Sequence, residues 1–242
     1  MERALLLFIS VLPVYLILAY IYKKDSEKES RKLLTKLFIY GVLSCFPATL
    51  LELYIGSYFP PEENMDLITL FIYVFLSIAL VEELCKWWMS YKISYNNEEF
   101  DQIYDGIVYT VFVSLGFACF ENILYVFDSG FMVGILRMFL AIPGHACDAI
   151  VMGNYYSLAK MANVMGNRSR EKRNLFLSIL MPTITHTLYD YCLFTGESTF
   201  LILFIILVIT IYIYSFKKVK HFSKIDGQFT SWHLNTNYMS KI

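Results

Sequence analysis

Charged residues are scarce in this sequence of 242 residues: they make up 17% of it, while hydrophobic residues make up 57%. A typical soluble domain has about 25% charged and about 45–50% apolar residues. The apolar residues also form runs long enough to cross a bilayer, whose hydrocarbon core is about 30 Å thick. The sequence therefore excludes an ordinary soluble domain and predicts an integral membrane protein.

Several common motifs are missing as well. The five cysteines are odd in number, lie in apolar segments and form no CxxC pair, which disfavours a disulfide framework and a cysteine zinc site. Neither GxSxG nor HExxH occurs, which removes the serine-hydrolase elbow and the common zinc-protease helix. The first 22 residues lack a basic start and a small-residue cleavage site, so they are predicted to be an uncleaved first span.

Seven apolar segments are long enough to be predicted as transmembrane helices. The proline at position 143 is expected to split the fifth, so that residues 131–138 lie along the membrane surface and the span begins near Phe139. We therefore predict an all-α, polytopic membrane helix bundle in residues 1–216, followed by a tail, residues 217–242, for which no fold is predicted. The seven segments are Ala4 to Tyr22, Leu37 to Tyr58, Leu67 to Ile93, Ile103 to Phe127, Phe131 to Ala159, Leu175 to Phe194 and Thr199 to Phe216.

Basic residues are divided unequally between the predicted loops. Seventeen of the 20 lysines and arginines follow the first, third, fifth and seventh segments, whereas only Arg3 lies on the opposite side. Basic loops stay in the cytoplasm, so the N-terminus is predicted to be outside and the C-terminus inside. The basic stretch NRSREKRN is interpreted as a topology determinant and not as a nucleic-acid site.

Ten ionisable residues interrupt the apolar segments, although each charge near a bilayer centre costs about 2.5–3.5 kcal/mol on insertion scales. Several lie three or four residues apart and so share a helix face, as Glu82 and Glu83 do with Lys86 and as His186 does with Asp190. We expect one water-filled cavity to hold Glu82 or Glu83 together with Glu121, His145, His186 and Asp190. The ten are Glu52, Glu82, Glu83, Lys86, Asp105, Glu121, His145, Asp148, His186 and Asp190.

This set of side chains suits hydrolysis. A carboxylate can take a proton from water and so make a nucleophile, while a neighbouring lysine helps keep that carboxylate charged. Histidines can direct a proton toward a developing oxyanion, or they can bind a metal. Two histidines and a carboxylate, here His145, His186 and Glu121, would form a zinc set. A glutamate-activated water and a metal-activated water both remain open at this point.

Other interpretations stay open too. Glu82, Glu83 and Lys86 could form a buried ion-pair network that only fixes helix packing. Intramembrane acids and histidines also build proton-coupled transporters and channels, although the sequence shows no internal repeat of the kind such transporters use. Asp105 is expected to cap the inner end of its helix, and Glu52 is expected to lie at the membrane interface.

Four motifs occur in order, each on its own apolar segment. They are EELCK (82–86), FACFE (117–121) followed by Asn122, a lone histidine, His145, in IPGHACD, and HTLYD (186–190). In this order they resemble the PrsW family of bacterial intramembrane proteases, which is related to the type II CAAX prenyl proteases. The resemblance extends from the N-terminus to about Phe194.

The resemblance implies a multi-pass endopeptidase of the bacterial cell membrane. Its implied partners are the lipid bilayer and a single-span membrane protein such as an anti-sigma factor, with no nucleic acid. The cofactor is left open between Zn²⁺ and none. In the implied site, Glu82 or Glu83 activates water, Glu121 and His145 assist, His186 and Asp190 complete the site, and Lys86, Asn122 and Asp148 support it.

Overall fold

The computed structural model describes residues 2–60 and 65–226, and within those ranges it contains helices and no β-strand. The predicted all-α class is therefore confirmed. The elements are α1 (Glu2–Lys24), α2 (Arg31–Tyr58), α3 (Leu67–Tyr73), a π-helical segment (Val74–Ala79), α4 (Leu80–Ser94), α5 (Asp105–Ser129), α6 (Phe131–Phe139), α7 (Ala141–Val164), α8 (Arg168–Phe194) and α9 (Ser198–Asp226).

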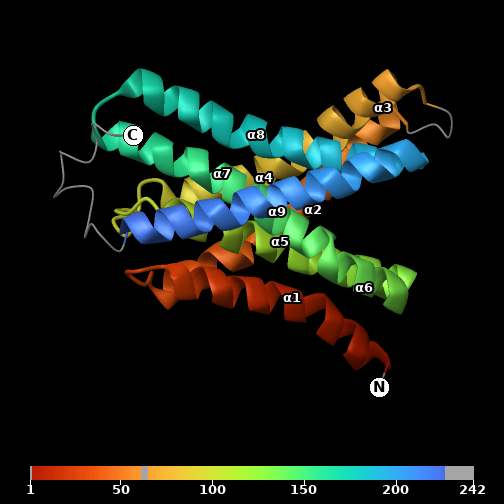
Figure 1. Cartoon of the computed structure of the whole chain (residues 1–242), viewed down its shortest axis with the longest axis horizontal. Helices are drawn as coiled ribbons and strands as arrows, with labels where there is room; N and C mark the ends of the chain where they lie inside the picture. The colour runs from red at the N-terminus through yellow and green to blue at the C-terminus, as the bar shows by residue number, and fades with distance from the viewer. Residues whose placement is uncertain (1, 61–64, 227–242) are drawn as a thin grey trace.

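The long helices run roughly along one axis, and α1 begins at the end of the bundle opposite to the one where α9 ends (Figure 1). The turns from α1 to α2, from α4 to α5 and from α7 to α8 lie together with the end of α9. We call this the basic end, because these turns carry the clustered lysines and arginines. The compartment that the basic end faces remains a prediction.

Among the described residues, six helical segments are long and apolar enough to cross a membrane. The predicted span from Leu175 to Phe194, the sixth in the chain, is not one of them. It lies within α8, which is less apolar because it begins with the basic stretch after Asn167 and carries His186 and Asp190. The expected break in the fifth span occurs at Leu140, and Pro143 falls in the first turn of α7, where its missing N–H removes no helix bond. At the other end, α9 continues past the predicted boundary at Phe216 to Asp226; the rest of the predicted tail lies outside the described residues.

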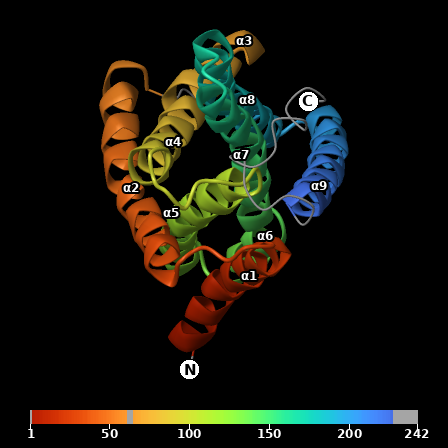
Figure 2. The same ribbon diagram turned by 90° about the vertical axis from the view of Figure 1, so that its left-hand side faces the viewer.

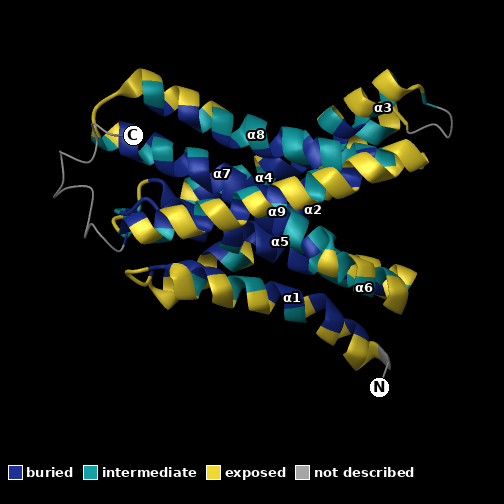
Figure 3. Ribbon diagram, viewed as in Figure 1, coloured by how far each residue is buried: buried dark blue, intermediate teal, exposed yellow. Residues whose placement is uncertain are grey.

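Burial is concentrated in α5. In its most apolar stretch 72% of the residues are buried, against 17% in α9. Seen along the axis, α5 lies in the interior beside α2, α4 and α7, with α1 and α9 on the outside (Figure 2). The outer faces of α1 and α9 are exposed, and their apolar side chains suit contact with lipid (Figure 3).

Glycines let α5 approach both of its main neighbours closely. A Cβ on Gly41 of α2 would lie 2.0 Å from the carbonyl oxygen of Val113, and one on Gly116 of α5 would lie 2.1 Å from the carbonyl oxygen of Phe38. On the other side of α5, a Cβ on Gly153 of α7 would lie 2.6 Å from the Cα of Ile107. Small residues at such seams drive helix association in membranes, where burial of apolar surface gives no advantage over lipid.

Candidate active site

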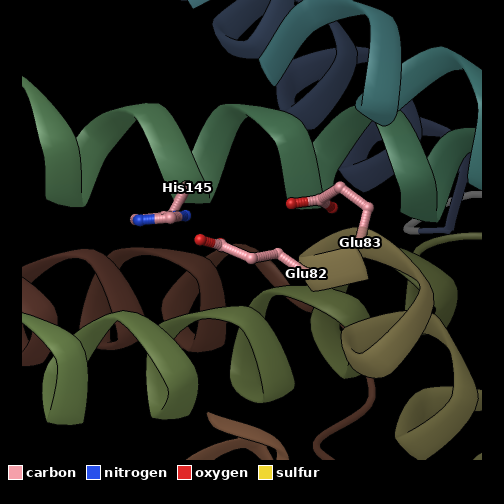
Figure 4. Close-up of side chains that lie close together, drawn as sticks. All are labelled: Glu82, Glu83 and His145. Carbon is pink, nitrogen blue, oxygen red and sulfur yellow. The ribbon is translucent and has the colours of Figure 1, made fainter. Parts of the chain in front are cut away.

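The EELCK motif follows directly after the π-helical segment and forms the first two turns of α4. Segments of this kind are rare and often lie at functional sites. Figure 4 shows Glu82 and Glu83 leaving α4 with both carboxylates turned to the side on which His145 descends from α7. Helices that are distant in the sequence thus bring these three side chains together.

Lys86 joins the three residues. Its ammonium Nζ lies 2.8 Å from Glu82 Oε2, 2.9 Å from Glu83 Oε1 and 3.2 Å from His145 Nδ1, and its side chain is fully buried. An ammonium can only donate, so His145 Nδ1 accepts and the ring carries its hydrogen on Nε2. One buried cation therefore neutralises part of the charge of two carboxylates and fixes the tautomer of His145.

His145 in turn donates from Nε2 to Glu121 Oε2, at 3.0 Å. The same carboxylate oxygen forms an ion pair with Arg137 Nη2 of α6, at 3.1 Å, and Arg137 Nε donates to Asn122 Oδ1 at 2.9 Å. The amide of Asn122 donates to the carbonyl oxygen of Ser10 in α1. Asn122 thus supports the site through Arg137, which the sequence analysis had not included among the site residues.

His186 links α8 to the same network. Its Nδ1 lies 3.0 Å from Glu83 Oε1 and its Nε2 lies 3.3 Å from Asp190 Oδ2. Carboxylates accept at both nitrogens, an arrangement satisfied by the doubly protonated ring. The rings of His145 and His186 meet edge to face, with centroids 5.6 Å apart. Asp148 lies one turn beyond His145 and accepts a hydrogen bond from Thr185 of α8, at 2.5 Å.

A cavity of about 780 Å³ opens beside this network. Glu82 lines it, whereas Glu83 is fully buried behind. Glu52 of α2 lines it as well, and its expected place at the membrane interface stays a prediction. Further polar side chains on the wall are those of Glu121, Arg137, His145, Asp148, His186 and Asp190.

Asp105 is the first residue of α5, the helix end at which it was expected, but its carboxylate does not cap that helix. Its carboxylate accepts from the backbone N–H groups of Asp101 and Gln102 in the preceding turn, and not from the first amides of its own helix α5. It lies at the basic end, about 24 Å from Glu121 at 1.5 Å per residue along α5. Asp105 therefore does not belong to the site around Glu82.

Among the described residues, two groups of side chains around this site have ligand atoms close enough to hold one metal ion. In the first, Glu82, Glu83 and His145, the Lys86 ammonium already lies among the three ligand atoms. The second consists of Glu83, Asp148 and His186, and the buried Glu83 Oε2 has no hydrogen-bond partner in the described part of the chain. Imidazole and carboxylate suit zinc, so the second group fits a zinc ion that would take the place of a proton on His186. Glu121, expected as a ligand from the sequence, lies in neither group.

Comparison with known proteins shows to which family the chain belongs. The family model of the PrsW family intramembrane metalloproteases matches residues 29–215. The chain belongs to the PrsW family. It is 38% identical over 210 residues to the Protease PrsW of Oceanobacillus iheyensis, covering 86% of this chain and 93% of the relative. It is 36% identical to the Protease PrsW of Geobacillus kaustophilus (77% and 79% covered) and 34% identical to that of Bacillus subtilis (76% and 80%). No solved structure matches the chain.

Membership of the PrsW family confirms a membrane-embedded peptidase and a multi-pass membrane protein of bacteria. It decides against the transporter interpretation of the same acids and histidines. A PrsW peptidase acts on a membrane-protein substrate in a lipid bilayer, and the chain has both the membrane helices and a polar cavity for that task.

Proposed function

We propose that Glu82 is the general base that activates water for cleavage of a peptide bond in a single-span membrane protein. The observation that carries this proposal is the unequal position of the two glutamates: Glu82 lines the cavity, while Glu83 is fully buried. Substrate and water can reach only the first. Lys86, 2.8 Å from the Glu82 carboxylate, gives this carboxylate a buried counter-charge.

Glu83 then acts as a positioning residue. Its Oε1 accepts from both Lys86 and His186, so it holds the lysine beside Glu82 and the imidazole at the cavity wall. His186 lies on the cavity wall, and a developing oxyanion would take the place of Asp190, 3.3 Å away, as the acceptor of its Nε2–H. His145 is locked between Lys86 and Glu121, and Asp190 keeps the outer side of the His186 ring oriented.

The reaction balances with these groups. Glu82 removes a proton from water as the water oxygen attacks the carbonyl carbon, and the carbonyl oxygen becomes the oxyanion that His186 stabilises. The protonated Glu82 then returns the proton to the leaving amine as the C–N bond breaks. Zinc bound by Glu83, Asp148 and His186 would supply Lewis-acid polarisation of the carbonyl and a lowered pKa for a bound water.

The position of the cavity and the family resemblance support a proposal for the substrate and for where it is cut. Leu124, Ser129, Leu193 and Phe194 extend the cavity wall toward the end of the bundle opposite to the basic end. That end is predicted to face the outside, so a substrate would be cut in its extracytoplasmic half. The PrsW resemblance implies an anti-sigma factor whose cut starts the release of a transcription factor.

Reconstituted proteolysis tests the base. Purified protein in liposomes is mixed with a tagged single-span substrate, and the rate is compared for Glu82→Gln, Glu83→Gln and the exposed control Glu197→Gln. We expect Glu82→Gln to lower the rate by about 10²–10⁴-fold and to lower the melting temperature less than Glu83→Gln does, because Lys86 keeps Glu83 as a carboxylate partner. Glu83→Gln should lower both the rate and the melting temperature, because it weakens the contacts of two buried side chains. Near-normal proteolysis by Glu82→Gln would contradict the proposal.

Metal analysis separates the two routes to an activated water. If zinc is held by Glu83, Asp148 and His186, the purified enzyme contains one zinc per chain and His186→Ala loses both the zinc and the activity. If the histidines only donate hydrogen bonds, zinc is absent, chelators have no effect, and His186→Ala lowers the rate by about 10²–10³-fold. His145→Ala serves as the comparison, since its Nδ1 is engaged by Lys86.

A further inference from the structure

The basic end contains a second cluster of buried acids, separate from the active site. Asp25 lies in the turn after α1, Asp105 is the first residue of α5 and Asp226 is the last residue of α9. One carboxylate oxygen from each lies within 4.8 Å of the others, and none of the three side chains is more than 5% exposed. Three segments distant in the sequence thus place three carboxylates around one small space.

Backbone amides orient two of these carboxylates. Asp105 Oδ2 accepts from the N–H of Gln102 at 2.6 Å and of Asp101 at 3.0 Å, and Asp226 Oδ1 accepts from the N–H of Tyr104 at 3.2 Å. In each case the other oxygen has no partner among the described residues. Each carboxylate is therefore held by one oxygen while its second oxygen remains available to a ligand.

Asp25 gives an independent indication that this cluster binds a ligand. It is 4% exposed, and neither of its carboxylate oxygens has a hydrogen-bond partner in the part of the chain that the structure describes. The nearby Lys28 does not supply one, because its ammonium donates to the backbone carbonyl oxygens of Tyr22 and Asp25. An unpartnered ionised carboxylate is costly to bury, so this arrangement calls for a counter-charge.

The side chains around the three aspartates also favour a bound counter-charge. Glu29 is also buried, and its Oε2 has no partner among the described residues. Its carboxyl group lies close enough to Asp105 and Asp25 to interact with both, so a fourth acid adjoins the cluster. Within 4.0 Å, no lysine, arginine or histidine side chain of the described residues forms an ion pair with Asp25, Asp105 or Asp226.

We propose that Asp25, Asp105 and Asp226 bind a hard divalent cation of the Mg²⁺ or Ca²⁺ class. Carboxylate oxygens alone, without nitrogen or sulfur, are the ligands that these ions prefer, and water and backbone oxygens can complete the coordination. The amides that hold Asp105 and Asp226 correspond to the outer-shell contacts that orient metal ligands.

Such an ion would fasten the basic end together. Ser223 of α9 already donates to the carbonyl oxygen of Lys24 at 2.5 Å, and the hydroxyl of Tyr104 donates to the carbonyl oxygen of Ile21 at 3.3 Å. A cation bound by the three aspartates adds a link between α9, the start of α5 and the turn after α1. The last turn of α9 would then be docked in an ion-dependent way.

Terbium luminescence can detect the site directly. Tb³⁺ replaces Ca²⁺ at oxygen sites and is excited by tyrosine nearby; Tyr104 and Tyr109, both fully buried, lie on the same stretch as Asp105. The purified full chain in detergent, with its active-site charges intact, is titrated with Tb³⁺. Ca²⁺ and Mg²⁺ are then added in separate experiments to displace it, and melting temperatures are recorded with each ion and with chelator.

We expect saturable binding of one Tb³⁺, displacement by Ca²⁺ or Mg²⁺, and a melting temperature several degrees higher with the displacing ion than with chelator. Asp25→Asn and Asp226→Asn should each weaken Tb³⁺ binding by at least about tenfold and remove the melting shift. The control Asp128→Asn, at an exposed position near the other end of α5, should change neither.

Two results would overturn the proposal. One is the absence of saturable binding and of any ion-dependent melting shift, which would mean that the cluster holds protons and not a metal. The other is binding that Asp25→Asn and Asp226→Asn leave unchanged, which would place the ion elsewhere. Asp25 lies in a turn outside the helices, so its variant remains a test even if Asp226→Asn does not fold.

Discussion

Helix α5 connects two buried acidic clusters whose negative charges are compensated in different ways. Around Glu121, at one end, the carboxylates meet cationic or polar side chains of the protein itself: Lys86, His145, His186 and Arg137. Around Asp105, at the other end, the described partners are backbone amides. The active site therefore contains its own counter-charges, whereas the basic end depends on a ligand from outside the chain.

This difference predicts opposite responses to the loss of a charge. Removal of a charge from the balanced cluster leaves an uncompensated partner in a buried site, which is strongly destabilising. Removal of a charge from the unbalanced cluster relieves repulsion as long as no cation is bound. The predictions below use this contrast, and they run from the largest expected effect to the smallest.

Lys86→Met should be the most damaging substitution. It removes the one cation that contacts both Glu82 and Glu83, and we expect a loss of about 3–5 kcal/mol in unfolding free energy together with loss of proteolysis. Thermal melting in detergent and the liposome assay measure the two effects. Lys92→Met on the exposed side of the same helix is the matched control. Equal melting temperatures for the two variants would show that the active-site charges do not depend on Lys86.

Gly41→Ala should separate α2 from α5 and so disturb both clusters at once. The added methyl group would lie 2.0 Å from a backbone oxygen that cannot move aside, and we expect a loss of about 1–3 kcal/mol. Gly56→Ala in the same helix has open space around its Cβ and should be neutral or slightly stabilising. Melting curves of the two variants provide the measurement, and a stable Gly41→Ala would show that the seam is looser than described.

Asp226→Asn should act in the opposite direction to Lys86→Met when chelator is present. The amide keeps the oxygen that accepts from the Tyr104 N–H and removes one negative charge, so a rise of about 2–4 °C in melting temperature is expected for about 1 kcal/mol of relieved repulsion. With Mg²⁺ or Ca²⁺ present, the wild-type chain should melt at a higher temperature than Asp226→Asn. A fall in melting temperature under chelator would mean that Asp226 already has a counter-charge within the chain.

Cysteine labelling should change neither stability nor activity, yet it assigns each cluster to a compartment. Two exposed positions suit the labelling. One is Glu197, in the turn between α8 and α9, and the other is Ser169, at the start of α8; they give the single-cysteine variants Glu197→Cys and Ser169→Cys. On a cysteine-free background, an impermeant reagent added to intact cells should label the first and not the second, because basic loops face the cytoplasm. The reverse pattern would invert the predicted orientation.

Local spacing was sufficient to predict much of the active site. The i,i+3 and i,i+4 relations placed Lys86 beside both glutamates and His186 beside Asp190, and the distances of 2.8, 2.9 and 3.3 Å agree with that expectation. The helical class also followed from the length of the apolar runs. These features depend on residues close in the sequence, which periodicity can relate to one another.

Contacts between distant helices could not be predicted in this way. Nothing local indicated that Arg137 would reach Glu121 from α6, or that Glu52 would line the cavity. The aspartate cluster combines positions 25, 105 and 226, and each of these alone resembles an ordinary helix-end aspartate. Their proximity arises from the packing of α1, α5 and α9, for which a single sequence contains no spacing signal.

The π-helical segment between α3 and α4 also has a consequence for how sequences of this family should be aligned. A π-turn holds one residue more than an α-turn, and one residue corresponds to a rotation of about 100° around the helix axis. Tyr73 and Ser77 face the cavity together with Glu82 because the extra residue lies between α3 and α4. A relative with a regular helix here should therefore show a single-residue gap within positions 74–79 and keep its glutamate pair in place.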